Sequence, residues 1–380
     1  MIVRGKIMLI LSMLLLVVFT LVVIQIILSL LAPGVAETIG LYPFRFWWMW
    51  WIIDIVVYGL SITVLILIGL GIGRFIEKRI PIDLDHLKAS MISTSLAVIS
   101  GAIFVFMFVT YLLDYQLATT LFIIAILFAL IPSLISWLVA PAIINVMYRC
   151  RYDPQLQKIV DRVATRAGMK PPKAVVAEMP IPNAFAYSSP LMGRYVAITT
   201  GLFKTVSRDG LEAVIGHELG HHKHRDNAVI MLFGLIPSTI YFVGRFLLYI
   251  GFVDRYSDGG ERRRSGGGML FMIVGVVLIV VSILLQVAVL SLSRLREHYA
   301  DAHGAKVTSP FAMIGALKSL DQFYRSTGAR KLIADSKIKP LFIYSLAESL
   351  VGFEEMLSTH PPIYKRIAFL ESLIGKEIEA

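Results

Sequence analysis

Two histidines four residues apart, His217 and His221, enclose a glutamate in the segment His-Glu-Leu-Gly-His. On an α-helix, side chains with this spacing project from the same face, so both imidazoles can bind one metal ion. Glu218 follows the first histidine and would face a water molecule on that metal, where a carboxylate can act as a general base. The segment predicts a zinc site with a catalytic glutamate.

Such a pattern fixes only three positions and arises by chance in about one chain in a hundred of this size, so its surroundings must decide. Asp209 and Glu212 stand three residues apart and open an apolar run that includes Val214 and Ile215. This arrangement resembles a capping box at a helix N-terminus. We therefore expect a helix that carries the two histidines two to three turns after its start.

The composition places the chain in a membrane. Of its 380 residues 57% are hydrophobic and 16% are charged, and the mean hydropathy is +0.75, which excludes a soluble globular domain. Six stretches reach the roughly 20 apolar residues that a spanning helix needs. They are Ile7 to Ala32, Phe46 to Gly73, Ala89 to Leu113, Tyr115 to Tyr148, Asn227 to Val253 and Gly266 to Ser293. Charges occur only in the second and fifth stretches, as Asp54 and Arg245.

The N-terminal stretch and the single cysteine indicate whether the chain has a cleaved signal peptide, disulfides or a thiolate metal site. The first stretch follows Arg4 and Lys6, but its uncharged run continues to Glu37 without a clear cleavage site, so we expect a retained anchor. The single cysteine, Cys150, excludes an internal disulfide framework and a thiolate metal site.

The net charge of +10 does not indicate nucleic acid, because no basic stripe is interleaved with aromatic residues. With a cytoplasmic N-terminus, the inner flanks of the spans carry twelve Lys and Arg residues and the outer flanks five, three of them in Arg262 to Arg264. Positive charge gathers on the cytoplasmic side of membrane proteins. We expect a multi-pass plasma-membrane protein in a lipid bilayer, with its metal helix in the cytoplasm.

This topology tests whether distant segments can share one site. Two spans separate residues 149–226 from residues 294–380, so both segments lie on the same side of the membrane. The predicted order is four transmembrane helices in 1–148, the first part of a cytosolic zinc-site domain in 149–226, a transmembrane helix pair in 227–293, and the second part of that domain in 294–380. The fold class is mainly α, a polytopic helical membrane protein of about six spans with a cytosolic α+β domain.

The first cytosolic segment predicts a small α/β unit. Its elements are a helix over 154–167, a strand over 174–178, and a hairpin of strands 184–188 and 194–200. A hairpin just before the metal helix would offer an edge strand, to which an extended peptide substrate can add by main-chain hydrogen bonds. A strand that only packs against the helix is the alternative.

A catalytic zinc site needs a third protein ligand, with the fourth position left for water. Glu297 is the strongest candidate, and on a helix Asp301 would share its face and accept a hydrogen bond from a ligand imidazole. A solvated charge run is the competing interpretation of this segment. His224 lies about one helical turn beyond the metal and is assigned an outer or interfacial place, and His298 is not expected to be a ligand.

Four motifs occur in the order of a known family. They are Asn183-Ala184-Phe185-Ala186, the segment 217–221, Ser293-Arg294 to Ala300-Asp301, and His360-Pro361-Pro362 with Arg366. Together they resemble the HtpX-type membrane zinc metalloproteases, which are related to the CAAX prenyl proteases and the OMA-type peptidases, over about residues 150 to 380. The usual HtpX pattern has one hydrophobic pair before the protease domain, whereas this chain has two.

The resemblance implies a gluzincin site and assigns roles. It implies one zinc per chain on His217, His221 and Glu297, with Glu218 as general base and Asp301 beside a ligand. It also implies that Asn183, with Ala184 and Phe185, contacts the substrate, and that His360 and Arg366 steady the oxyanion. A plain helix-entry role for His360 stays open.

Three functions are therefore compared. A zinc endopeptidase of membrane or misfolded proteins, in membrane protein quality control, fits a site close to the bilayer surface. Processing of prenylated CAAX peptides would need an enclosed chamber in the membrane. A transporter or zinc-binding scaffold would use Asp54 and Arg245, because charges inside a membrane are costly and often functional. The oligomeric state is not predicted.

Overall fold

The computed structural model describes residues 83–256, 267–326 and 360–378. Four of the described helices are long and apolar enough to cross a membrane. They are α4 (Leu84–Leu112), α5 (Tyr115–Met147), α9 (Asp226–Tyr256) and α10 (Gly267–Val307). These helices match the third to sixth predicted spans, whereas the first two spans and Asp54 lie outside the described residues.

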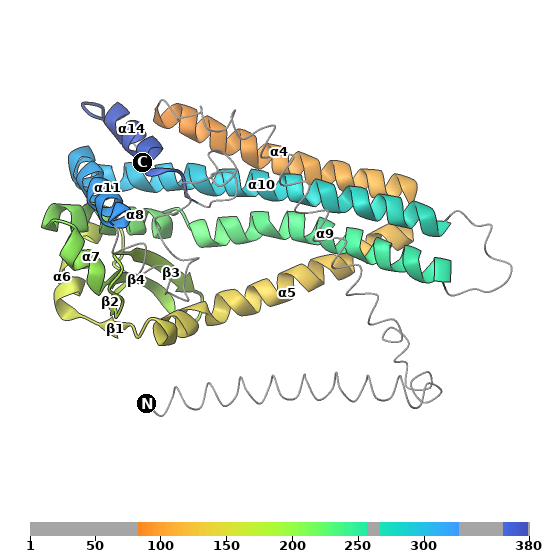
Figure 1. Ribbon diagram of the computed structural model, residues 1–380, viewed down its shortest axis with the longest axis horizontal. Coiled ribbons are helices and arrows are strands. Elements are labelled where there is room, and N and C mark those ends of the chain that lie inside the picture. Colours follow the sequence, from red (N-terminus) through yellow and green to blue (C-terminus); the bar gives the residue numbers. More distant parts are fainter. Residues whose placement is uncertain (1–82, 257–266, 327–359, 379–380) are drawn as a thin grey trace.

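The four long helices form two hairpins that return to the same end of the bundle, where the remaining described elements gather (Figure 1). Val109, Phe122, Val243 and Leu278 pack between the hairpins in one apolar core. Side chains such as that of Phe104, which is 68% exposed, point outward, as expected for helices that face lipid rather than water. Because α10 runs back to the end of the bundle where α9 begins, the segment before α9 and the last turns of α10 can meet there.

The small domain at this end contains a four-stranded sheet in the order β1-β2-β4-β3. Its strands are β1 (Arg151–Tyr152), β2 (Lys173–Ala177), β3 (Ala184–Ser189) and β4 (Gly193–Thr199). β3 and β4 form the antiparallel hairpin predicted from the sequence, β2 pairs parallel to β4, and β1 is an additional short strand. β3 lies at one edge of the sheet, next to the metal helix.

Five shorter helices complete the described part of the chain. They are α6 (Pro154–Arg166), α7 (Thr200–Thr205), α8 (Arg208–Lys223), α11 (Pro310–Arg325) and α14 (Ile363–Ser372). Residues of α6, the sheet, α8 and α11 share one apolar core, and α4, α10, α11 and α14 share a second. The predicted helix over 154–167 is confirmed to within one residue.

The predicted capping box of the metal helix is wrong by two residues. The helix α8 is capped by Ser207, whose hydroxyl accepts a hydrogen bond from the backbone N–H of Gly210 at 3.1 Å. Asp209 therefore lies in the first turn, and Glu212 pairs with Arg162 and Arg166 of α6 instead of with the helix end. A hydroxyl at the N-cap satisfies a free N–H as well as a carboxylate does.

Glycines let α8 and α10 approach closely. A Cβ added at Gly220 would lie 3.2 Å from the Ala300 Cα, and one at Gly304 would lie 2.9 Å from the Ala213 carbonyl oxygen. Small residues at a helix crossing allow backbones to come within this range. The crossing positions the metal helix against the last three turns of α10.

Two of the three predicted domain boundaries, at 226/227 and 293/294, fall inside helices. α10 continues without a break past Ser293, so the sixth span and the segment that carries Glu297 form one helix. Asp226 already belongs to α9. The metal helix and the start of the fifth span are separated only by His224 and Arg225, and Arg225 has a φ of +53°.

Candidate active site

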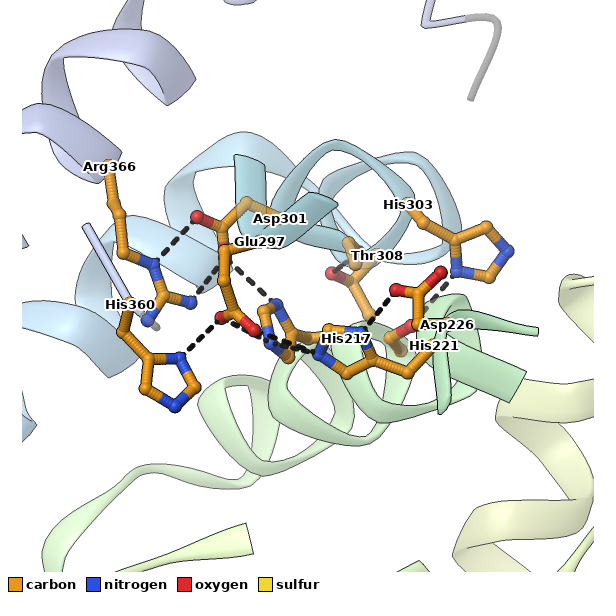
Figure 2. Close-up of polar contacts among 11 residues, drawn as sticks. His217, His221, Asp226, Glu297, Asp301, His303, Thr308, His360 and Arg366 are labelled. Atoms are coloured by element: carbon orange, nitrogen blue, oxygen red, sulfur yellow. Dashed lines mark hydrogen bonds and ion pairs between the residues drawn. The ribbon is translucent and has the colours of Figure 1, made fainter. Parts of the chain in front are cut away.

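His217 and His221 of α8 and Glu297 of α10 come together, with one ligating atom from each within 4.8 Å of the others (Figure 2). The two Nε2 atoms are 3.1 Å apart. Glu297 Oε2 lies 3.6 Å from His217 Nε2, and Glu297 Oε1 lies 3.5 Å from His221 Nε2. Glu297, which is 76 or more positions from the two histidines in the sequence, thus forms one compact triangle with them.

This triangle fits a zinc ion. Zinc bonds of about 2.1 Å at a tetrahedral angle place neighbouring ligand atoms about 3.4 Å apart, close to the separations of 3.1, 3.5 and 3.6 Å. Two imidazole nitrogens and a carboxylate oxygen form one of the donor sets of catalytic zinc, which keeps a fourth position for water. The residues present therefore suit the metal that the sequence predicts.

A carboxylate lies behind His217. Asp301 Oδ1 is 2.9 Å from His217 Nδ1, and both side chains are buried. Arg366 of α14 donates two hydrogen bonds to Asp301, from Nε at 2.8 Å and from Nη2 at 2.6 Å. A proton held on Nδ1 leaves Nε2 unprotonated and free to bind metal.

A second carboxylate, which sequence reasoning missed, lies behind His221. Asp226 Oδ2 is 2.6 Å from His221 Nδ1, and Asp226 also pairs with Arg296. Each histidine of the triangle is therefore backed by an aspartate and an arginine. In the sequence, Asp226 is five residues beyond His221 and would lie on another face of a continuous helix.

The nearby charges act on both imidazoles. Burial alone would lower the pKa of His217, but the carboxylates of Asp301 and Glu297 outweigh burial and raise this pKa to about 10. For His221, burial is likewise outweighed by Glu297 and Asp226, and its pKa is raised. A site that attracts protons in this way also attracts a cation, and metal binding must displace the protons.

Glu218 lies on the buried side of α8 and is 3% exposed. Its negative charge contributes to the raised pKa of His221, so the carboxylate lies near the triangle. Within the described ranges it makes no hydrogen bond. A carboxylate without a hydrogen-bond donor can take a proton from a water molecule.

The C-terminal motif reaches the same site. His360 Nδ1 lies 2.9 Å from Glu297 Oε2, and its side chain is 25% exposed, so it lies at the rim of the triangle. Arg366, by contrast, is fully buried with its guanidinium on Asp301. The structure thus places the Arg366 guanidinium on Asp301, behind His217, and its role at the oxyanion stays a prediction.

Comparison with known proteins decides the family. A family model described as Peptidase family M48 matches residues 151–374. A "Protease HtpX homolog" from Pyrobaculum aerophilum is 38% identical over 349 residues, which cover 85% of this chain and 99% of the relative. Another from Archaeoglobus fulgidus is 41% identical over 266 residues, 65% of this chain and 76% of that relative. The chain belongs to peptidase family M48.

Within that family the chain is an HtpX-type metalloprotease, and its long apolar helices embed it in a membrane. A solved structure, "Crystal Structure of S. mikatae Ste24p", matches with a TM-score of 0.48 and 17% identity over 77% of this chain and 68% of that one. An M48 metalloprotease requires a metal cofactor, and His217, His221 and Glu297 form a grouping that could hold it.

The predicted substrate segment of this M48 peptidase lies at the start of the edge strand β3. Asn183 is fully buried, and its side-chain oxygen accepts a hydrogen bond from the Ala184 N–H at 3.0 Å. Its backbone N–H donates a hydrogen bond to the Thr199 hydroxyl oxygen at 2.8 Å, and its carbonyl oxygen accepts one from the Thr199 N–H at 3.0 Å. Ala184 and Phe185 are 2% and 9% exposed. These side chains support the edge strand, so contact with a substrate would come from the backbone of β3.

The other histidines near the site serve the packing of α8 and α10. His222 Nε2 lies 2.8 Å from the Tyr195 carbonyl oxygen of β4, and His303 Nδ1 donates to the Gly216 carbonyl oxygen at 2.9 Å. The His224 ring packs on Tyr299, with centroids 4.4 Å apart, and the His298 ring packs on Phe369. His86, away from these residues in the sequence, is in the first turn of α4 beside Asp83.

Proposed function

We propose that the protein is an integral-membrane zinc endopeptidase that cleaves membrane or misfolded proteins at the cytoplasmic face, in membrane protein quality control. The observation that carries the proposal is the triangle of His217, His221 and Glu297 beside the buried carboxylate of Glu218. A bound zinc ion would polarise the scissile carbonyl and make the attacking water more acidic.

The residues of the chain would perform the proton transfers. Glu218 would take a proton from the attacking water and deliver it to the leaving amine, as a general base and then a general acid. His360 lies at the rim of the site and would donate a hydrogen bond to the oxyanion that forms on the carbonyl. Asp301, held by Arg366, would keep His217 in the tautomer that offers Nε2 to the metal. No covalent intermediate with the enzyme is needed.

The position of the site supports substrates at the bilayer surface. His221 lies five residues before the start of α9, and Glu297 lies in the same helix as the sixth span. The triangle (Figure 2) is therefore where α8 meets the last turns of α10, and α8 lies at the end of the helix bundle in Figure 1. The excess of Lys and Arg on the predicted inner flanks supports the cytoplasmic side, and the two spans between residues 149–226 and 294–380 would leave both segments on that side.

The edge strand β3 supports binding of an extended peptide. β3 pairs with β4 along one side only within the described sheet, and it lies next to α8. A substrate chain could add to its other side by main-chain hydrogen bonds, with no demand for a particular side chain. Broad preference of this kind suits a protease that removes unfolded proteins.

The test is cleavage of an unmodified, unfolded membrane protein by the purified, zinc-loaded enzyme, beside cleavage of a farnesylated CAAX peptide. We expect cleavage of the unfolded protein, and a loss of at least about 10²-fold in Glu218→Gln, which should still bind one zinc. A fully active, zinc-loaded Gln variant would refute the role of Glu218. Cleavage of the farnesylated peptide alone would assign prenyl-peptide processing instead, and zinc-independent transport without proteolysis would assign a transporter.

A further inference from the structure

The break between α8 and α9 brings Asp226 to the metal site. In a continuous helix, five residues correspond to a rotation of about 500°, so Asp226 would point about 140° away from His221. Instead, α8 ends at Lys223, and Arg225 adopts a left-handed φ of +53°. Asp226 then begins α9, with Oδ2 only 2.6 Å from His221 Nδ1.

Arg296 holds this break in place. Its Nη2 pairs with Asp226 Oδ1 and also donates a hydrogen bond to the His224 carbonyl oxygen at 2.7 Å. The side chains of Arg296 and Asp226 are 11% and 9% exposed. Charge-assisted hydrogen bonds between groups shielded from water are stronger than those on an open surface. Arg296 directly precedes Glu297 in α10. One turn of that helix therefore supplies both the candidate ligand Glu297 and the arginine that holds Asp226 against His221.

The arrangement repeats the chemistry behind His217 with residues from other elements. His217 is backed by Asp301 and Arg366, from α10 and α14, whereas His221 is backed by Asp226 and Arg296, from α9 and α10. Asp226 lies in the first turn of a membrane helix, where the helix dipole also stabilises a negative charge. The second pair therefore connects the start of one span, and the last turns of another, to a ligand.

We propose that Asp226 and Arg296 form a positioning pair, in which Asp226 holds the Nδ1-protonated tautomer of His221 and Arg296 holds Asp226. The pair makes metal affinity depend on the packing of α9 against α10 at the bilayer surface. This inference rests on the proposed function, because it assumes that His221 binds zinc.

The experiment measures zinc affinity of the full-length protein in detergent by competition with a chelator. We expect Asp226→Ala to weaken zinc binding about 10- to 100-fold and Arg296→Met to weaken it about tenfold. Since Arg296 acts through Asp226, the double variant should bind zinc no more weakly than Asp226→Ala alone. The visible absorption of the cobalt-substituted protein should shift in Asp226→Ala, because the His221 ring is no longer oriented. Asp321→Ala is the matched control, since it breaks an Asp–Arg pair of 2.8 Å on the exposed side of α11.

Each outcome decides the proposal. Wild-type zinc affinity and an unchanged cobalt spectrum in Asp226→Ala would overturn it, and additive losses in the double variant would overturn the role of Arg296. If Asp226→Ala does not fold, Asp226→Asn keeps the acceptor oxygen and removes the charge, and it must still weaken zinc binding while Arg296→Lys partly retains it. Failure of the wild-type protein to bind zinc would refute the proposed function itself.

Discussion

Gly304→Ala should disturb the site through the crossing of α8 and α10. The added methyl group would lie 2.9 Å from the Ala213 carbonyl oxygen and 3.1 Å from the His217 backbone nitrogen. Ordinary contacts of this kind are about 3.3 to 3.6 Å, so α10 must move away from α8 by about 0.5 Å. The atoms that resist are backbone atoms of the metal helix, which cannot rotate aside.

The displacement is large for a metal site. The separation of 3.6 Å between His217 Nε2 and Glu297 Oε2 would grow to about 4.1 Å, which two bonds of about 2.1 Å can span only when nearly collinear. Overpacking costs about 1 to 3 kcal/mol, and the better helix propensity of alanine offsets about 1 kcal/mol of it. We expect Gly304→Ala to fold and to lose about 10- to 100-fold in cleavage rate and in zinc affinity, since about 1 Å of misplacement costs about 10²-fold.

The assay compares Gly304→Ala with Gly315→Ala, whose added methyl group meets nothing within 4 Å on α11. Proteolysis of an unfolded reporter and zinc competition are measured on both purified variants, with thermal melting as the check on folding. The control should match or slightly exceed the wild type. Equal activity and equal zinc affinity in the two variants would refute the argument that this crossing sets the ligand spacing.

Three further results are expected. Chelation should abolish proteolysis and zinc should restore it, whereas activity that persists without metal would contradict the metalloprotease mechanism. Arg366→Met should lower zinc affinity by about tenfold or more by freeing Asp301, and an unchanged affinity would show that the buried pair is only structural. Burial would raise the pKa of Glu212, but Arg166 and Arg162 outweigh burial and lower it; its stabilisation is therefore present above about pH 4.3 and lost as the pH falls through the lowered pKa. Glu212→Gln should accordingly melt at a lower temperature than the wild type at pH 7, and this difference should shrink as the pH falls through the lowered pKa; a difference that does not depend on pH would count against the ion pairs.

The part of the site that follows regular periodicity could be predicted from the sequence. The spacing of His217 and His221, and that of Glu297 and Asp301, each depends only on a helix that is present in the structure. An even number of predicted spans between the two segments allowed them to meet on one side of the membrane. Long apolar runs locate the described spans, and the alternation of apolar and polar residues locates the strands of the hairpin. Both patterns could be used because they follow directly from which side chains are buried.

The missed features depend on irregular backbone or on packing between distant elements. Asp226 reaches His221 because Arg225 adopts a left-handed conformation, which a glycine would have signalled and an arginine does not. The partner of Arg366 and the close approach at Gly304 are tertiary contacts, which no local pattern contains. Ser207 caps α8 in place of Asp209 because both residue types are good caps and only the backbone angles separate them.

The most direct test of the central claim is anomalous diffraction at the zinc edge from Glu218→Gln crystals, combined with zinc analysis of Glu297→Ala. We predict one zinc per chain, about 2.0 to 2.2 Å from His217 Nε2, His221 Nε2 and a Glu297 oxygen, and loss of the metal in Glu297→Ala. Zinc bound elsewhere, or full zinc occupancy in Glu297→Ala, would contradict the account.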